Sequence, residues 1–266
     1  MSSVSIFAAG SRSILRSVTS LWMPSDGALH GLALDRLMKW NLIAVALLFV
    51  LAHFLLVFVL TRRRSRPRHS RFWIVESLPL AFLCTLYIGM AVAAQHLWAM
   101  NRFEGPSPTA MQVEVVGVQF QWYFRYPGPD ATFGSTKPEL VNAGEGNPLG
   151  IDSQNEQGND DIVSSELVLP TGREVDLRLR AHDVIHGFFI PGMRLKQNAV
   201  PGLTLHIHFT PVTPGEYPIL CTQVCGLGHG HMEAKLRVVP QAEFNAWLGQ
   251  RTQKHLAQLR QAIGGQ

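Results

Sequence analysis

The sequence Cys221-Thr-Gln-Val-Cys225-Gly-Leu-Gly-His229-Gly-His-Met232 places two thiols, an imidazole and a thioether close together along the chain. Thiolate and thioether are soft donors and imidazole is intermediate, so the set suits copper better than magnesium or calcium. One cysteine would serve a single copper ion, whereas two thiolates on one loop can bridge a pair of copper ions. A pair that shares one unpaired electron changes little in structure on reduction, as a fast electron relay requires.

Two other interpretations of this stretch stay open at this point. Cys221 and Cys225 could form a small-loop disulfide, because the segment is expected to lie in an oxidising compartment. They could also be ligands of a structural zinc, although methionine is rarely a zinc ligand and the spacing is a poor zinc pattern.

Two long apolar stretches predict a membrane hairpin. The chain has 266 residues, 47% of them apolar, and residues 42–60 contain a single polar residue, His53. Residues 72–98 form a second run, interrupted by Glu76, Pro79 and Gln95. Each run can cross about 30 Å of hydrocarbon as a helix. We therefore expect a two-helix hairpin over residues 40–100, after an N-terminal outward segment over residues 1–39.

The sequence between these helices fixes their expected orientation. Residues 61–71 contain six arginines, and such loops stay on the cytoplasmic side. The N-terminus and all residues after the second helix are then outside. A nucleic-acid patch is a poor alternative, because the basic run is confined between two membrane helices.

Residues 128–165 are predicted to form an acidic loop or insertion. Between Pro127 and Ser165 there are seven Asp or Glu residues against Lys137 alone, a net charge of −6. An acidic surface would steer a basic partner toward this side of the domain. The alternative is a solvated loop without a partner.

Period-two alternation from residue 111 onward predicts a β-sandwich over residues 105–240. Strands are expected at residues 111–118, 119–126, 166–170, 174–180, 203–209, 216–220 and 234–239. Many short strands separated by Pro-Gly turns are typical of a sandwich or barrel. After Pro240 the apolar period becomes helical, which predicts a C-terminal helix over residues 241–266. His206 and His208 are expected on an exposed strand face, and His231 is expected to point away from His229.

A second imidazole for the Cys-rich stretch is available at His186, in the sequence Asp183-Val-Ile-His186-Gly-Phe188. At this point the chain resembles subunit II of the haem–copper cytochrome c oxidases, which carries Asp-Val-x-His-Ser-Phe and Cys-x3-Cys-x3-His-x2-Met. The segment from Lys196 to Gly202 is similar to the family's Lys-x-Asp-Ala-x-Pro-Gly, and residues 119–126 to its aromatic strand. The resemblance covers roughly residues 25–250.

The resemblance implies two N-terminal transmembrane helices, an all-β cupredoxin-like Greek-key sandwich and a binuclear copper centre called CuA. Its implied metal ligands are His186, Cys221, the backbone carbonyl of Gln223, Cys225, His229 and Met232. Phe120 and Trp122 become the candidates for the point where electrons enter. Asp183 becomes a candidate to orient a metal ligand through a hydrogen bond.

Two departures from the family pattern weigh against a magnesium site at the boundary with subunit I. Gln223 stands where the family usually has Glu, and Asn198 where it usually has Asp. An amide is a weaker ligand for a hard cation than a carboxylate. Glu76 within the second span is either part of a proton path or a residue that faces a partner helix.

By this resemblance the chain is a subunit of a respiratory terminal oxidase in a bacterial inner membrane, with its copper domain on the periplasmic side. It would accept electrons from cytochrome c or a similar basic donor and pass them to haem in subunit I, with subunit III also present. That partner would reduce oxygen to water and translocate protons, because this chain has no oxygen-reducing site. The alternatives are the CuA subunit of a nitric oxide reductase and a non-enzymatic, membrane-tethered copper carrier. No nucleic-acid partner is expected.

Overall fold

The computed structural model describes residues 23–62, 72–102, 104–152, 154–155, 158 and 160–264. The chain forms two compact units, a helical unit over residues 32–105 and a second unit that combines residues up to Gly31 with residues 106–266. Most of the predicted N-terminal segment and of the arginine-rich loop lies outside the described residues.

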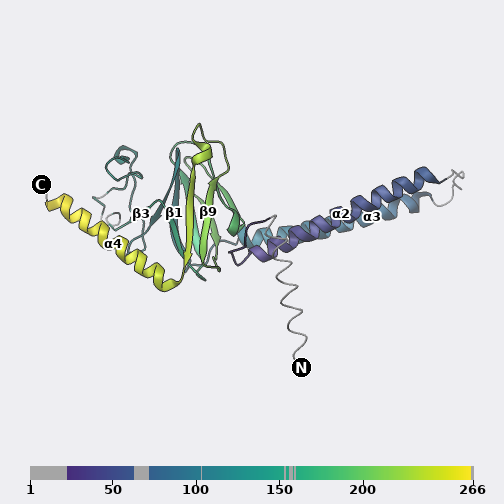
Figure 1. Cartoon of the computed structure of the whole chain (residues 1–266), viewed down its shortest axis with the longest axis horizontal. Coiled ribbons are helices and arrows are strands. Elements are labelled where there is room, and N and C mark those ends of the chain that lie inside the picture. Colours follow the sequence, from purple (N-terminus) through teal and green to yellow (C-terminus); the bar gives the residue numbers. More distant parts are fainter. Residues whose placement is uncertain are drawn as a thin grey trace, which may run out of the picture. The chain divides into compact units, whose positions relative to one another are not determined.

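The helical unit consists of α2 (Gly31–Thr61) and α3 (Phe72–Arg102), labelled in Figure 1. The spans Gly31–Thr61 and Ser77–Met100 are long and apolar enough to cross a membrane, judged by length and composition alone. The apolar side chains of these spans are mostly exposed in the isolated chain, which suits a surface that lipid or another subunit covers. The side chain of Glu76 lies outside the described set.

The second unit is a sandwich of two five-stranded sheets. The first has the order β3-β2-β1-β5-β8 and the second the order β4-β10-β9-β6-β7. The strands are β1 (Met111–Val118), β2 (Gln121–Tyr126), β3 (Ile162–Ser164), β4 (Leu167–Pro170), β5 (Val175–Ala181), β6 (His186–Ile190), β7 (Leu195–Ala199), β8 (Leu205–Phe209), β9 (Gly215–Cys221) and β10 (Glu233–Val239). Short 3₁₀ turns lie at Pro138–Leu140, Pro191–Met193 and His229–His231.

Alternating side chains fill the space between the sheets. Val175, Leu177 and Leu179 of β5 are fully buried. Trp122 and Phe124 of β2 are equally buried and face the same core. Burying each of these side chains contributes on the order of 2 kcal/mol, which makes this layer the main source of the domain's stability.

The sandwich prediction is confirmed, and three strands were missed. β6 lies inside its sheet between β9 and β7, and His186, Gly187 and Phe188 are all buried, so its sequence shows no polar alternation. β3 and β7 are short. β3 follows turn-rich sequence and β7 precedes it, so neither shows a clear strand pattern. His186 therefore is the first residue of a strand.

The C-terminal helix is confirmed as α4 (Gln241–Gly264), and the structure shows where its first turns pack. Phe244 is buried in the core, and the rings of Phe244 and Trp247 lie 6.5 and 5.1 Å from the ring of Tyr126. The chain before α2 also belongs to this unit, because Ala28 is buried and the Gly27 amide donates to the Gly192 carbonyl at 2.8 Å.

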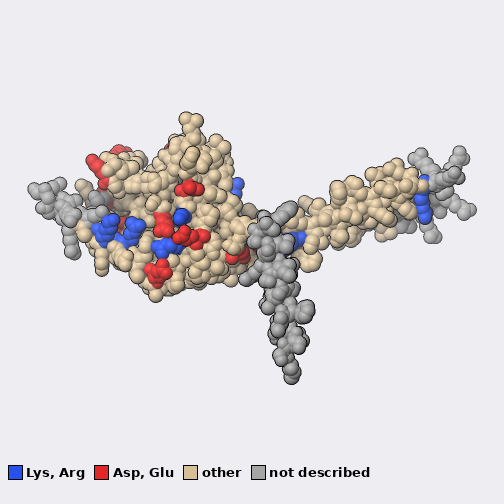
Figure 2. Space-filling model, in the orientation of Figure 1, with Lys and Arg blue, Asp and Glu red and all other residues tan. Residues whose placement is uncertain are grey.

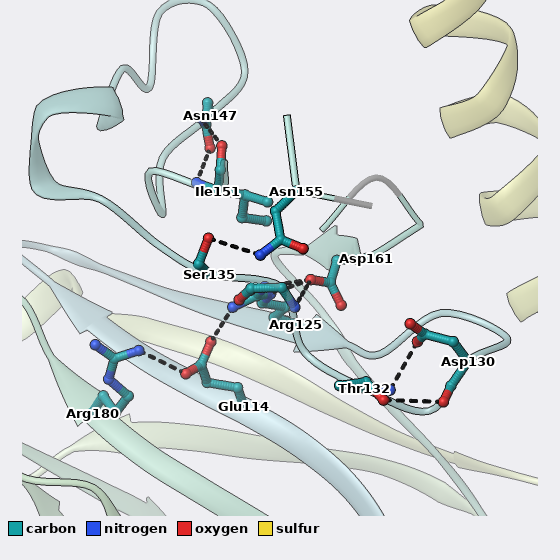
Figure 3. Close-up of polar contacts among 11 residues, drawn as sticks. Glu114, Arg125, Asp130, Thr132, Ser135, Asn147, Ile151, Asn155, Asp161 and Arg180 are labelled. Carbon is teal, nitrogen blue, oxygen red and sulfur yellow. Dashed lines mark hydrogen bonds and ion pairs between the residues drawn. The ribbon is translucent and has the colours of Figure 1, made fainter. Parts of the chain in front are cut away.

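Part of the predicted acidic loop, residues 128–165, packs against the sandwich. Leu149 is almost fully buried, and β3 at the end of the segment pairs with β2. Figure 3 shows Asp161 pairing with Arg125, whose guanidinium also donates to Glu114 at 3.1 Å. Part of the segment's negative charge is therefore neutralised by a buried ion pair and is not exposed at the surface.

Candidate metal centre

The predicted ligands lie together at one end of the sandwich. β6 begins with His186, and β9 ends with Cys221, which lies opposite Phe188 in the antiparallel register. The loop after β9 carries Cys225, and a 3₁₀ turn at His229–His231 returns the chain to β10. Met232 is the residue between that turn and β10.

The sulfur atoms lie at distances that suit shared metal ions. The Sγ atoms of Cys221 and Cys225 are 4.0 Å apart. That is about twice the length of a disulfide bond, and both cysteines are free. It is shorter than two metal–thiolate bonds of about 2.3 Å, so one ion between the two atoms can contact both.

The other donors lie around this sulfur pair. Cys225 Sγ is 3.7 Å from His229 Nδ1 and 3.7 Å from Met232 Sδ. The donor atoms of His186, Cys221 and Cys225 all lie within 4.8 Å of one another. Cys221 Sγ is 3.2 Å from the Gln223 carbonyl oxygen, so the backbone donor implied for this position also faces the cluster.

His186 supplies the clearest sign that the cluster is built for a metal. Its ring is fully buried, and Nε2 is bonded to Asp183 Oδ1 at 2.8 Å. Its other ring nitrogen, Nδ1, is buried and has no protein hydrogen-bond partner. A buried polar atom without a partner is costly, and a bound metal ion would satisfy it.

Asp183 fixes the orientation of that ring. Besides His186, its carboxylate accepts hydrogen bonds from the backbone N–H groups of Gln119 and Val184, both at 2.7 Å. Partial burial acts to raise the pKa of Asp183, but the hydrogen bonds from His186 and from these amides outweigh it and hold the pKa below its usual value. The ionised carboxylate therefore accepts a proton-bearing Nε2 and leaves Nδ1 as the donor atom.

The turn between β1 and β2 holds the Cys loop in place. The Gln119 side-chain amide donates to the Cys225 carbonyl at 2.5 Å. The Phe120 ring lies against Gly226 and Gly228, where an added Cβ at Gly228 would come within 2.5 Å of the ring. Gln119 was not among the predicted site residues.

Burial controls the chemistry of Cys225. Burial, followed by the nearby Cys221, raises the pKa of Cys225 to about 11. The thiol therefore keeps its proton at neutral pH until a cation replaces it, as expected of a buried metal ligand.

The two aromatic candidates for electron transfer differ in position. Trp122 is fully buried behind the site, with its ring 5.8 Å from the His186 ring and edge-on to it. Phe120 is 38% exposed and reaches the surface beside the Cys loop. A docked protein can therefore contact Phe120 and not Trp122.

Among the remaining candidates, His231 is exposed. His206 is exposed on its strand, but its Nδ1 pairs with the buried Asp176 at 2.9 Å, which was not foreseen. The Gln223 side chain is exposed, and Asn198 lies on β7 opposite Gly187. Neither placement adds a carboxylate, so the case against a magnesium site stays a prediction.

The sandwich is also the part of the chain that matches known proteins. Residues 111–239 match the family model for the periplasmic domain of cytochrome c oxidase subunit II. An alternative cytochrome c oxidase subunit 2 of Bradyrhizobium diazoefficiens is 34% identical over 180 residues, which are 66% of this chain and 64% of the relative. Cytochrome c oxidase subunit 2 of a Synechocystis species is 33% identical over 145 residues, which are 54% of this chain and 34% of the relative. The chain thus spans less than two thirds of these relatives.

Among solved structures, the periplasmic domain of subunit II of cytochrome oxidase from Bradyrhizobium japonicum is similar to this chain. It is 24% identical with a TM-score of 0.42, and the match covers 57% of this chain and 99% of that one.

Proposed function

We propose that this chain, which belongs to the cytochrome c oxidase subunit II family, is the copper-bearing, electron-accepting subunit of a haem–copper respiratory oxidase. The observation that carries the proposal is the convergence of His186, Cys221, Cys225, His229 and Met232 on one small volume, with His186 Nδ1 buried and unpartnered. Soft thiolate and thioether donors with two imidazoles are a ligand set for copper.

Each residue of the cluster has a proposed part in holding a pair of copper ions. Cys221, Cys225, His186 and His229 would hold the ions, and Met232 and the Gln223 carbonyl would be weaker donors. Two copper ions held there would supply one-electron oxidation and reduction with little change in structure. The buried Cys225 and Met232 keep water from one side of the cluster, which limits reorganisation of solvent.

The direction of electron flow follows from the other subunits of such an oxidase. A cytochrome c donor delivers electrons at the surface near Phe120, and the acceptor is haem in subunit I. Oxygen reduction to water and proton translocation belong to that partner, and subunit III completes the assembly. We place the two apolar helices in the bacterial inner membrane and the sandwich on its periplasmic side.

The test uses the full chain co-expressed with its partner subunits and loaded with copper. We expect two copper ions per chain in this subunit and an EPR hyperfine pattern from two equivalent copper nuclei. Cys225→Ser should abolish that pattern, whereas His231→Ala, a matched change in the same loop, should leave it intact. A preparation that binds a single ion per chain, or that joins Cys221 to Cys225 as a disulfide, would sink the proposal.

Two alternatives make different predictions in the same preparation. The CuA subunit of a nitric oxide reductase would keep every ligand, so oxygen and nitric oxide consumption must be compared in the intact complex. A copper carrier would present its ligands on an exposed, adaptable loop, whereas His186, Cys225 and Met232 are buried here. A carrier would also release its copper to an acceptor protein.

A further inference from the structure

A pocket lies between α4 and β3, away from the metal end of the sandwich, where the proposed ligands lie. Its volume is about 190 Å³, and its lining residues are Ile162, Val163, Arg251, Lys254 and His255. Ile162 pairs with Tyr126, the last residue of β2, whereas the turn that holds the Cys loop precedes the first residue of β2. The length of β2 therefore separates the pocket from the metal centre.

The pocket is lined by basic side chains. Three of its five lining residues are basic, and none of the five is acidic. The chain contains no Asp or Glu residue after Glu243, so the later part of α4 offers no acidic partner to these cations. Figure 2 shows basic side chains over α4. Arg251 and Lys254 are three positions apart, and like charges that are neighbours on a helix surface destabilise the helix. An anion in the pocket would offset this repulsion.

The acidic residues that are near β3 or α4 along the chain have other contacts. They are Asp160, Asp161, Glu166 and Glu243. Asp161 pairs with the buried Arg125, and Asp160 lies against Gly128. Glu166 and Glu243 both pair with Arg237, at 3.3 and 2.8 Å. Within the described part of the chain, neither Arg251 nor Lys254 forms an ion pair, so both cations are available to a ligand.

Both walls of the pocket offer donors that suit an oxyanion. On α4, the Arg251 guanidinium carbon lies over the Trp247 ring, 5.8 Å from its centre, and the Trp247 ring packs edge-on against Tyr126 at 5.1 Å. A cation held over an aromatic face keeps its planar fork of N–H donors available to a ligand. On the other wall, β3 is the edge strand of its sheet and pairs with β2 alone. Backbone N–H groups at a sheet edge contribute to anion-binding sites.

We propose that this pocket binds a small multivalent oxyanion of the phosphate class, held by Arg251 and Lys254. A guanidinium matches phosphate oxygens two at a time, and a lysine adds a point charge beside it. The volume of about 190 Å³ is below the range of about 300 to 1,000 Å³ that larger ligands occupy. Inorganic phosphate, pyrophosphate or the phosphate of a lipid headgroup therefore fits better than a whole nucleotide.

Binding would tie the later part of α4 to the edge of the first sheet. Phe244 is buried in the core and Trp247 and Leu248 pack against it, so the start of α4 is already anchored. Arg251 and Lys254 follow these anchors. We therefore expect bound phosphate to slow amide hydrogen exchange in residues 251–257 several-fold and to leave residues 241–248 unchanged.

The experiment titrates inorganic phosphate and pyrophosphate into the full chain, purified with its partner subunits, by isothermal titration calorimetry at constant ionic strength. We expect one saturable site per chain. Arg251→Gln and Lys254→Gln should each weaken binding about tenfold, because each removes a charge-assisted hydrogen bond. Lys254 is exposed, so its variant should fold normally. Lys235→Gln, which removes an exposed lysine that pairs with Glu216 outside the pocket, should bind as the wild type does.

The same complex in lipid nanodiscs separates the two sources of phosphate. If phosphatidylglycerol weakens pyrophosphate binding and phosphatidylcholine does not, the pocket takes a lipid headgroup. If neither lipid competes, the pocket takes a soluble phosphate. Either result supports the site, provided that Lys254→Gln weakens binding in both preparations.

Three results would overturn the inference. They are the absence of saturable binding, equal binding by Lys254→Gln and Lys235→Gln, and binding of a glutamate-rich peptide that pyrophosphate does not displace. The last result would mean that the cations recognise an acidic protein. The inference does not rest on the copper centre, so a wild-type complex that binds pyrophosphate without the two-copper EPR pattern contradicts the proposed function alone.

Discussion

Replacing Gln119 by leucine tests whether the β1–β2 turn positions the Cys loop. The Gln119 amide donates to the Cys225 carbonyl at 2.5 Å, and Gln119 was not predicted from any metal-binding motif. Leucine has a similar volume and no donor, so Gln119→Leu removes the bond and leaves the packing of the turn nearly intact.

The magnitude follows from what the lost bond leaves behind. A partly buried carbonyl that loses its donor costs about 1 to 3 kcal/mol. Because the carbonyl belongs to a proposed ligand residue, we expect this cost to fall on the loaded centre as a roughly tenfold loss of copper affinity. The assay is competition with a chelator of known affinity in the full complex, read by the visible absorption of the copper centre.

The control is Gln121→Leu, two residues further along the chain at the start of β2. Gln121 is exposed, and its side-chain oxygen accepts a single bond from the Tyr123 hydroxyl at 3.2 Å. That variant should keep wild-type copper affinity. The reasoning is refuted if Gln119→Leu and Gln121→Leu behave alike, or if Gln119→Leu lowers the stability of the metal-free chain without changing copper affinity.

Three further predictions concern the groups that hold the domain and its ligands. Asp183→Asn should lower copper affinity by roughly 10- to 100-fold, because an amide orients the ligand ring less well; chelator competition measures this, and an unchanged affinity would remove Asp183 from the site. Asp161→Asn should lower the free energy of unfolding by about 3 kcal/mol, because it removes one of the two carboxylates that pair with the buried Arg125 guanidinium, while the exposed Asp130→Asn should change it by less than about 0.5 kcal/mol in urea titrations. Tyr126→Phe should cost about 2 kcal/mol, because the buried hydroxyl both donates to the Val168 carbonyl at 3.1 Å and accepts from its amide at 2.7 Å. Burial raises the pKa of Tyr126, so above pH ~10 the unfolded chain loses this proton first and stability falls as pH rises. Tyr126→Phe should weaken that alkaline loss, and an identical pH profile would count against the assignment.

Local spacing predicted the thiols, His229 and Met232, because all four lie on one short stretch of chain. His186 needed the resemblance, since no spacing rule joins a strand start to a loop some forty residues later. Gln119 was missed because its partner, Cys225, is 106 positions away and glutamine carries no metal-binding signal. Contacts of this kind depend on how loops meet, which the sequence does not encode locally.

The period-two alternation also predicts which aromatic side chains of residues 119–126 are buried, although the sequence analysis did not use it for this. Trp122, Phe124 and Tyr126 are two residues apart, so they share one face of β2, and that face is the core. Phe120 precedes the strand and lies in the turn, where its ring is free to reach the surface. The same reasoning fails for β6, because a strand flanked on both sides in its sheet and covered on both faces has no polar alternation to reveal it.

The distribution of charge explains why one carboxylate can matter at the metal end. Glu114 joins Arg125 to Arg180, whose guanidinium donates to it at 2.9 Å, and Asp161 completes a group of two positive and two negative side chains. An unpaired charge about 10 Å from a metal would change its redox free energy by roughly 1.7 kcal/mol at an effective dielectric constant of about 20. Because these four charges cancel, their combined effect on the centre is small. Asp183 instead bonds the ring of a proposed copper ligand directly, so it acts through the ring that it orients.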